Sequence, residues 1–271
     1  MKKFLTALQL YSVRDDLENS FYDTLKKVKE FGYDGVEFAG LYNHSADEIK
    51  KMCEELQLIP ISAHVPFDQL MSDLSLIEVY AQIGCKYIAI PYLTEEYRPG
   101  HEKFMEFVKG AKLISKKAKE FNIQLCYHNH DFEFEKVNGE YGLDLIYKAI
   151  SPELLSTELD TCWVNVGGEN PAEYIRKYNQ RVEIVHLKDF AGSKSDNMYA
   201  LIGIDDKDNK KSSGEFEFRP VGYGLQDFKS IIKACDEVQA SWLIVEQDNP
   251  SMKKSALECA KMSIDYLKTI L

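Results

Sequence analysis

The nine residues LCYHNHDFE (Leu125–Glu133) begin as an apolar, strand-like run and end in polar and titratable side chains. Because alternate residues of a strand share a face, Cys126, His128 and His130 point the same way. Two imidazoles about 7 Å apart on one face of a strand end are typical of a metal or acid–base site. The alternative is a polar loop in which both histidines form hydrogen bonds with the backbone. The rest of the sequence is needed to choose between these two interpretations.

Short apolar runs and longer amphipathic stretches alternate along the chain. The short runs predict eight strands: Phe4–Tyr11, Gly35–Phe38, Ile59–Val65, Lys86–Tyr92, Ile123–His128, Leu154–Asp160, Val182–Lys188 and Trp242–Gln247. The longer stretches predict helices over Ser20–Phe31, Ser45–Leu56, Asp68–Ile83, Glu102–Phe121, Leu143–Ile150, Pro171–Tyr178, Leu225–Val238 and Ser251–Leu271. Ser45 and Glu48 form a capping box, Gly32 closes a helix, and Asn138-Gly139 predicts a hairpin turn.

Strict alternation of strands and helices predicts a parallel sheet, and eight units predict one closed (β/α)8 TIM barrel over residues 1–271. The alternative is an open doubly wound sheet. That fold is expected to carry a Gly-rich phosphate turn after its first strand, where this chain reads YSVRD (Tyr11–Asp15). A long excursion, 189–224, interrupts the alternation. Its Lys/Asp/Ser-rich centre, Asp205–Ser213, predicts a mobile tip between two strand-like arms.

Charge and composition disfavour several classes of partner. The net charge is −11 and the pI is about 5.1, whereas a nucleic-acid-binding domain normally shows a basic face. No continuous apolar run approaches the roughly 20 residues that span a bilayer, so no membrane partner is expected. The six cysteines are scattered without a CxxC pair, which indicates reduced thiols in a cytoplasmic protein.

Polar side chains gather where the predicted strands end, which is where the site of a (β/α)8 barrel lies. They are Gln9, Tyr11, Glu37, His64, His128, His130, Glu133, Glu158, Asp160, His186, Lys188, Asp189, Glu246 and Asp248. Carboxylates and imidazoles that converge in this way suit a divalent cation such as Mn²⁺, Zn²⁺, Co²⁺ or Mg²⁺. Asp160, His186 and Glu246 are the first three predicted ligands; for each, an ion pair or a capped loop is the alternative.

Eight segments, in order along nearly the whole chain, resemble a known family. They are LQLYSVR (Leu8–Arg14), GYDGVEF (Gly32–Phe38), SAHVPF (Ser62–Phe67), YHNHDFEF (Tyr127–Phe134), ELDTCWV (Glu158–Val164), VHLKD (Val185–Asp189), PVGYGLQDF (Pro220–Phe228) and VEQD (Val245–Asp248). The chain resembles the xylose-isomerase-like TIM-barrel family of sugar phosphate isomerases/epimerases, inosose dehydratase and endonuclease IV. Endonuclease IV relatives use a three-metal cluster with many more ligands.

The resemblance implies one divalent metal ion, with Mn²⁺ or Zn²⁺ favoured, at Asp160, His186 and Glu246. The strand-five ligand of the family is usually Glu, but here the matching positions carry Cys126 and His128. Some members show a Glu-x-His arrangement, and on that pattern His128 is the fourth ligand and His130 the base. A second departure is Tyr223, which stands where many relatives carry Glu.

The implied chemistry is proton abstraction next to a sugar carbonyl through an enediolate. A sugar or sugar phosphate isomerase/epimerase is the first prediction, and a dehydratase or lyase on a keto-sugar or inosose is the second. His130 and Glu246 are the proton-transfer candidates. Lys188 either stabilises the developing charge or forms an ion pair with Glu158. A non-catalytic sugar- or metal-binding subunit is the alternative from another class.

The remaining residues around the predicted mouth are expected to contact a small-molecule sugar or sugar phosphate. They are Gln9, Tyr11, Glu37, His64, Glu133, Glu158, Trp163 and Arg219. A structural ion pair for Glu37, a surface position for Arg219 and plain packing for Tyr11 and Trp163 are the alternatives. Relatives of this kind imply a homodimer or homotetramer.

Overall fold

The computed structural model describes residues 4–194 and 216–271, and these form a closed eight-stranded barrel. Its strands are β1 (Leu5–Gln9), β2 (Gly35–Phe38), β3 (Ile59–His64), β4 (Tyr87–Ile90), β5 (Gln124–His128), β8 (Ser156–Asp160), β9 (Val182–Leu187) and β12 (Trp242–Val245). Neighbouring strands are parallel, in the order β1-β12-β9-β8-β5-β4-β3-β2. The predicted (β/α)8 barrel is therefore confirmed.

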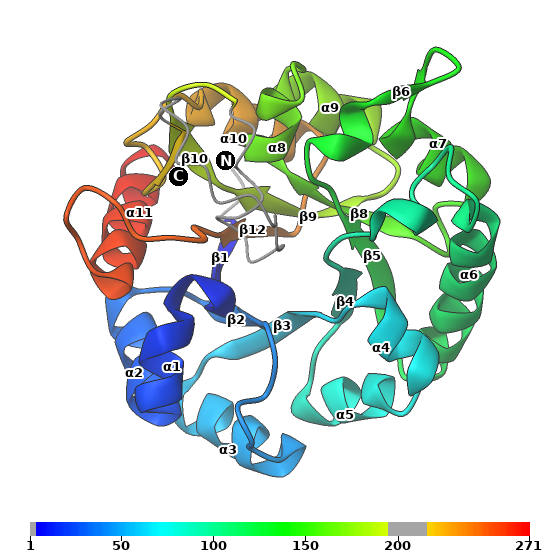
Figure 1. The fold of residues 1–271 in the computed structure, drawn as a ribbon. Helices are drawn as coiled ribbons and strands as arrows, with labels where there is room; N and C mark the ends of the chain where they lie inside the picture. The colour runs from blue at the N-terminus through cyan, green and yellow to red at the C-terminus, as the bar shows by residue number, and fades with distance from the viewer. Residues whose placement is uncertain (1–3, 195–215) are drawn as a thin grey trace, which may run out of the picture.

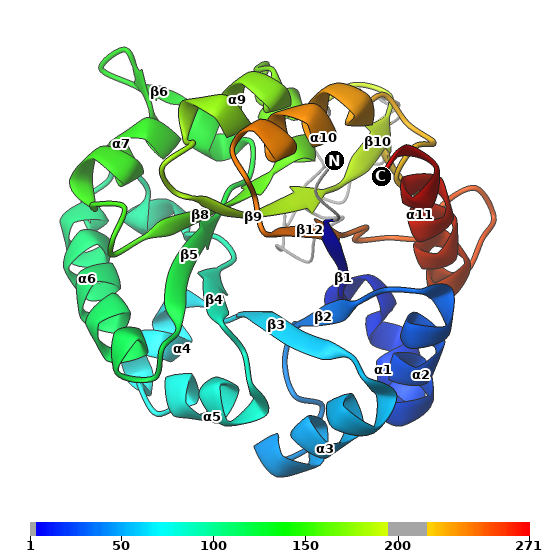
Figure 2. The same cartoon turned by 180° about the vertical axis from the view of Figure 1, so that it is seen from behind.

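Helices surround the barrel as a ring in both views (Figures 1 and 2). They are α1 (Arg14–Asn19), α2 (Phe21–Phe31), α3 (Ala46–Leu56), α4 (Phe67–Ser72), α5 (Leu76–Ile83), α6 (Phe104–Glu120), α7 (Gly142–Ala149), α8 (Thr161–Val166), α9 (Pro171–Lys177), α10 (Phe228–Glu237) and α11 (Ala256–Ile270). Three 3-10 turns, η1 (Leu10–Val13), η2 (Glu95–Tyr97) and η3 (Phe132–Phe134), lie in the connections. Among the described helices, none is long and apolar enough to cross a membrane.

Alternation along each strand separates an outer core from the contents of the barrel. Leu8, Val36 and Val185 belong to the large apolar core that includes buried residues of the surrounding helices. Inside the barrel, an apolar layer that includes Ala7, Ile184, Trp242 and Ile244 forms a separate cluster. The residues two positions further along the strands are polar: Gln9, His186 and Glu246 follow Ala7, Ile184 and Ile244. The polar layer therefore lies at the carboxyl ends of the strands, above an apolar floor.

Several predicted element boundaries differ from the structure, and four of these differences have a clear local reason. The single helix predicted over Asp68–Ile83 is two helices, because Asp73 is extended and its carboxylate accepts bonds from both the amide and the hydroxyl of Ser75. The last helix begins at Ala256 rather than Ser251, where Ser255 and Glu258 form a capping box. The first strand ends at Gln9 rather than Tyr11, because the Gln9 side chain accepts the Tyr11 amide at 2.9 Å.

The fourth difference is the start of α10, which lies at Phe228 rather than at Leu225. Its N-cap is Asp227, which accepts the Ser230 amide. Other local predictions are confirmed: Ser45 and Glu48 form a capping box, and Gly32 closes α2 with a φ of 101°. Asn138-Gly139 joins the short strands β6 (Lys136–Val137) and β7 (Glu140–Tyr141), and both turn residues have positive φ.

The two arms of the long excursion form an antiparallel pair, β10 (Asp189–Ala191) and β11 (Glu217–Arg219). The predicted tip, Asp205–Ser213, lies outside the described residues. The Asp189 carboxylate accepts backbone N–H groups from Phe190, Gly222, Gly224 and Gln226, at 2.8–3.2 Å. This carboxylate holds the chain that returns towards the barrel.

Replacing Asp189 with Asn is expected to destabilise the protein by about 2–3 kcal/mol. The amide nitrogen of Asn cannot accept, so two of the four backbone N–H groups lose their acceptor. Urea unfolding monitored by circular dichroism checks the loss, with the exposed Asp68→Asn as control. A free energy of unfolding equal to that of the control variant would contradict the structural role of Asp189.

Candidate metal centre in the barrel mouth

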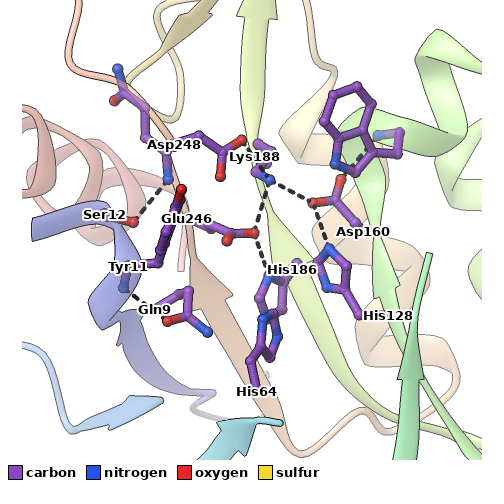
Figure 3. Close-up of polar contacts among 12 residues, drawn as sticks. Gln9, Tyr11, Ser12, His64, His128, Asp160, His186, Lys188, Glu246 and Asp248 are labelled. Atoms are coloured by element: carbon purple, nitrogen blue, oxygen red, sulfur yellow. Dashed lines mark hydrogen bonds and ion pairs between the residues drawn. The ribbon is translucent and has the colours of Figure 1, made fainter. Parts of the chain in front are cut away.

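Four strands bring two imidazoles and two carboxylates together at the carboxyl end of the barrel (Figure 3). His128 ends β5, Asp160 ends β8, His186 lies in β9, and Glu246 follows β12 directly. Asp160 and His186 are register partners on adjacent strands. His186 Nδ1 lies 3.0 Å from Glu246 Oε2, and His128 Nε2 lies 3.7 Å from Asp160 Oδ2. One ligand atom from each residue lies within 4.8 Å of all the others, and we call these four residues the mouth cluster.

The mouth cluster fits a divalent cation. Asp160 caps α8, because its Oδ1 accepts the Trp163 amide at 2.9 Å. Its other oxygen, Oδ2, is buried and has no hydrogen-bond partner. Two imidazoles and two carboxylates are a donor set that Zn²⁺, Co²⁺ and Mn²⁺ accept. Burial by itself lowers the pKa of His186, but Glu158 and Glu37 raise it well above its ordinary value, so an ion that binds there displaces a proton. Of the two positions that match the family's strand-five ligand, only His128 belongs to this cluster. Burial raises the pKa of the Cys126 thiol well above its ordinary value.

Lys188 lies beside the mouth cluster among three carboxylates. Its Nζ is 2.9 Å from Glu246, 3.0 Å from Asp248 and 3.5 Å from Asp160. Lys188 therefore pairs with these three carboxylates and not with Glu158, which the sequence suggested as its ion-pair partner. Burial by itself lowers the pKa of Lys188, but Asp248, Glu246 and Asp160 raise it well above its ordinary value. The side chain is a fully buried ammonium that partly balances the negative charge of the site.

A second polar group lies deeper in the barrel, and we call it the inner cluster: Gln9, Glu37, His64 and Glu158. Glu158 Oε1 lies 2.5 Å from His64 Nε2, 3.1 Å from His186 Nε2 and 3.2 Å from His128 Nδ1. Glu37 Oε1 accepts from Gln9 Nε2 at 2.7 Å and lies 2.8 Å from His186 Nε2. Gln9, Glu37 and Glu158 have no exposed surface.

A cavity of about 350 Å³ opens above the mouth cluster. It is lined by the polar side chains His64, His128, His130, Lys188, Glu246 and Asp248, and by Tyr11, Ala39, Gly40, Pro66, Gln69, Tyr80, Pro91 and Tyr92. Sequence reasoning missed Gln69 and Tyr92. Their positions shortly after the third and fourth strands are the signal that could have found them, since the loops there form the mouth.

His130 lies in this cavity with its ring held by aromatic neighbours. It stacks on Phe132 with ring centroids 5.1 Å apart and on Trp163 at 5.2 Å. Its Nδ1 is buried and has no hydrogen-bond partner. Burial, reinforced by the Lys188 charge, lowers the pKa of His130 well below its ordinary value. A neutral imidazole with an available nitrogen in a cavity is able to accept a proton.

Six of the eight predicted substrate-binding residues do not line the cavity. Gln9, Glu37 and Glu158 lie in the inner cluster, and Glu133, Trp163 and Arg219 have other partners. Glu133 accepts the Tyr127 hydroxyl at 2.6 Å and the His130 amide at 2.7 Å. Trp163 is buried against His130 and Phe218. Arg219 pairs with Glu217 at 2.6 Å. Of the predicted set, Tyr11 and His64 line the cavity itself.

Stability is expected to fall less steeply with pH in the Glu133→Gln variant. Burial raises the pKa of Glu133 from 4.5 to about 8, so the folded chain keeps a proton that the unfolded chain releases. The contribution of this group to stability is therefore fully present below pH 4.5 and is lost as the pH rises towards 8, by at most about 1.4 kcal/mol per pH unit. Urea unfolding at pH 5 and pH 8 measures the difference; equal pH dependence in both proteins would contradict the shift.

Comparisons with known proteins agree on the fold. A family model described as "Xylose isomerase-like TIM barrel" matches residues 25–270. An inosose dehydratase from Clostridium beijerinckii is 22% identical over 278 residues, which cover 93% of this chain and 90% of the relative. A sugar phosphate isomerase/epimerase structure from Parabacteroides distasonis has a TM-score of 0.77 at 22% identity, with 98% of both chains covered. A probable 3-DHS dehydratase from Bacillus anthracis has a TM-score of 0.74 at 12% identity, with 98% of this chain and 99% of that chain covered.

Proposed function

Because the chain belongs to the xylose isomerase-like TIM barrel family, we propose that it is a divalent-metal-dependent sugar isomerase or epimerase. The observation that carries the proposal is the mouth cluster, with a neutral imidazole, His130, in the same cavity. His128, Asp160, His186 and Glu246 would hold the ion. Bound there, a divalent cation supplies Lewis acidity, which polarises a carbonyl and acidifies the neighbouring C–H.

The chain's own residues bind the sugar and move the proton. The lining of the cavity combines aromatic and proline residues, Tyr11 and Tyr92 among them, with polar groups such as His64 and Lys188. A sugar ring fits such a cavity, because its C–H face packs on aromatic rings while its hydroxyls meet polar groups. His130 accepts the proton from the carbon next to the carbonyl, and Lys188 balances negative charge that develops on the sugar oxygens.

Protonation of the neighbouring carbon makes the reaction an isomerisation. Protonation of the same carbon on its opposite face, by a second group for which Glu246 is the candidate, makes it an epimerisation. A dehydratase acting on a keto-sugar or inosose is the second candidate. It is favoured by the curated inosose dehydratases, which match over 93% of this chain. Loss of a hydroxyl from the carbon next to the deprotonated one uses the same base and the same ion, and the proton accepted by His130 passes to the leaving hydroxyl, which departs as water. The proposed partner is a small-molecule sugar or sugar phosphate. The six buried, free cysteines suit a reducing cytoplasm.

Exchange of solvent deuterium into candidate sugars tests the proposal. The Mn²⁺-loaded protein is incubated in D₂O with ketoses, ketose phosphates and an inosose, and the products are examined by NMR and mass spectrometry. We expect deuterium at the carbon next to the carbonyl of at least one candidate. An isomer or epimer without loss of water identifies the first function, and loss of water identifies the second. Binding of metal and sugar without exchange in any candidate would make the chain a non-catalytic binding subunit.

A further inference from the structure

Two imidazoles of the mouth cluster each touch the inner cluster with their second nitrogen. His186 directs Nδ1 to Glu246 and Nε2 to Glu37 and Glu158. His128 directs Nε2 towards Asp160 and Nδ1 to Glu158. Both rings therefore stand between the two clusters, with one nitrogen on each side. The inference that follows rests on the proposed function. The hydrogen-bond partner of one ring nitrogen determines that the other nitrogen of the same ring binds the metal ion.

The inner carboxylates already act as acceptors. Glu37 Oε1 accepts a hydrogen bond from the side-chain amide of Gln9 at 2.7 Å, and its second oxygen accepts one from the Ser62 hydroxyl. Three imidazole nitrogens surround Glu158 Oε1 within 3.2 Å. A carboxylate oxygen in this environment is stabilised when the facing nitrogens carry hydrogen. The inner cluster therefore favours a proton on His128 Nδ1 and on His186 Nε2.

We infer that Glu158, supported by Glu37, is a positioning residue that makes His128 bind the ion through Nε2 and His186 through Nδ1. A hydrogen bond to the outer nitrogen of a metal-bound imidazole fixes the tautomer, orients the ring and raises its basicity. Glu158 is completely buried, and the lining of the substrate cavity does not include it. Its role is thus to act through the two histidines, rather than to bind a sugar hydroxyl as its strand-end position predicted.

The same atoms also suit a competing assignment. His64, His128, Glu158 and His186 offer ligand atoms within 4.8 Å of one another, so a second cation is chemically conceivable there. A second cation held by all four of these residues would make His128 and His186 bind metal through both nitrogens, which means that each ring has lost its last proton. Hydrogen bonds to Glu158 and Glu37 satisfy the same atoms without that cost, and the geometry therefore favours one ion.

Titration with Co²⁺ alone, without sugar, tests the inference. We expect one Co²⁺ per wild-type chain, and a Kd that is about 10–100-fold higher in Glu158→Gln with an altered visible absorption spectrum. Glu183→Gln is the matched control. Glu183 lies near the start of β9, where its carboxylate accepts the Tyr87 hydroxyl at 3.2 Å, and its replacement should leave Co²⁺ affinity unchanged. The thermal midpoint of each variant shows whether it is folded.

A second measurement avoids any variant. Nitrogen-15 NMR of the Zn²⁺-loaded wild-type protein should show His128 protonated at Nδ1 and His186 protonated at Nε2. The reverse tautomers would overturn the inference, as would an unchanged Kd in a folded Glu158→Gln variant or a wild-type chain that binds no ion. Two Co²⁺ per wild-type chain falling to one in Glu158→Gln would instead make the inner cluster a second metal site. Deuterium exchange by a wild-type chain that binds Co²⁺ would keep the proposed function, so that the other results remove only the inference. A wild-type chain that binds no ion would remove both the inference and the metal dependence of the proposed function.

Discussion

Replacing Asp160 with Asn is expected to remove the bound divalent ion and to lower kcat/KM by about a thousandfold. That factor corresponds to about 4 kcal/mol of transition-state stabilisation, the contribution expected of a Lewis-acidic ion. The amide oxygen of Asn can still accept the Trp163 N–H that caps α8, so the helix keeps its start. The amide nitrogen takes the place of Oδ2, which lies 3.5 Å from Lys188 Nζ, and Lys188 keeps its closer ion pairs with Glu246 and Asp248. The variant therefore separates metal binding from folding.

Elemental analysis of the purified protein and steady-state kinetics measure the two losses together. Asp265→Asn is the control, because Asp265 is exposed on α11 and pairs with Lys261. We expect the control to keep the ion and the full rate. An Asp160→Asn variant that keeps one ion per chain and the wild-type kcat/KM would remove Asp160 from the site.

Replacing His130 with Gln is expected to reduce kcat by about 10²–10⁴-fold, the usual contribution of a general base. Gln is uncharged and polar but does not accept a proton, so it tests the base directly. His130 is not a member of the mouth cluster, so metal stoichiometry should stay at the wild-type value, and KM should change little. Deuterium exchange next to the carbonyl should fall with kcat.

His101→Gln is the matched control, because His101 is exposed and lies outside the cavity. Its exchange rate should equal that of the wild-type protein. If His130→Gln exchanges deuterium at the full rate, the base is another group of the cavity, and Glu246 is the remaining candidate. The assignment of His130 would then be wrong although the metal site would stand.

The barrel was predictable because its signals are local. Apolar runs of strand length alternate with amphipathic stretches, and this pattern requires no knowledge of distant contacts. The positions of Asp160, His186 and Glu246 followed from the same pattern, since parallel strands bring their carboxyl ends to one side. Short elements escaped prediction: α1 and α8 have six residues each, too few for a helical period to be visible.

The division between the mouth cluster and the inner cluster was not predictable from the sequence. Glu158 and Asp160 share a strand face, yet one lies in the inner cluster and the other beside the cavity. The depth of each residue in the barrel depends on how the eight strands are staggered around it. A register irregularity at Thr157/Glu158 changes this stagger further. A sequence gives the face of a residue but not its depth. Gln9 and Glu37 were assigned to substrate for the same reason.

The predicted oligomeric state, a homodimer or homotetramer, stays a prediction, since only a single chain is described.

Tyr223, which stands where many relatives were expected to carry Glu, is exposed on the loop after β11. Its neighbour Gly222 lies close to α11, where an added Cβ would meet the Tyr266 ring at 2.3–2.5 Å with a φ of 90°. The backbone of this turn is thus fixed by packing against α11, independently of what residue 223 contributes to the mouth.

The most direct test of the account is an anomalous difference map from crystals of the wild-type protein soaked in Mn²⁺. We expect one strong peak per chain, bonded by His128, Asp160, His186 and Glu246, with His130 facing the same cavity. A peak elsewhere in the barrel, or none at these four side chains at full soaking concentration, would contradict the claim that they hold the ion on which the chemistry depends.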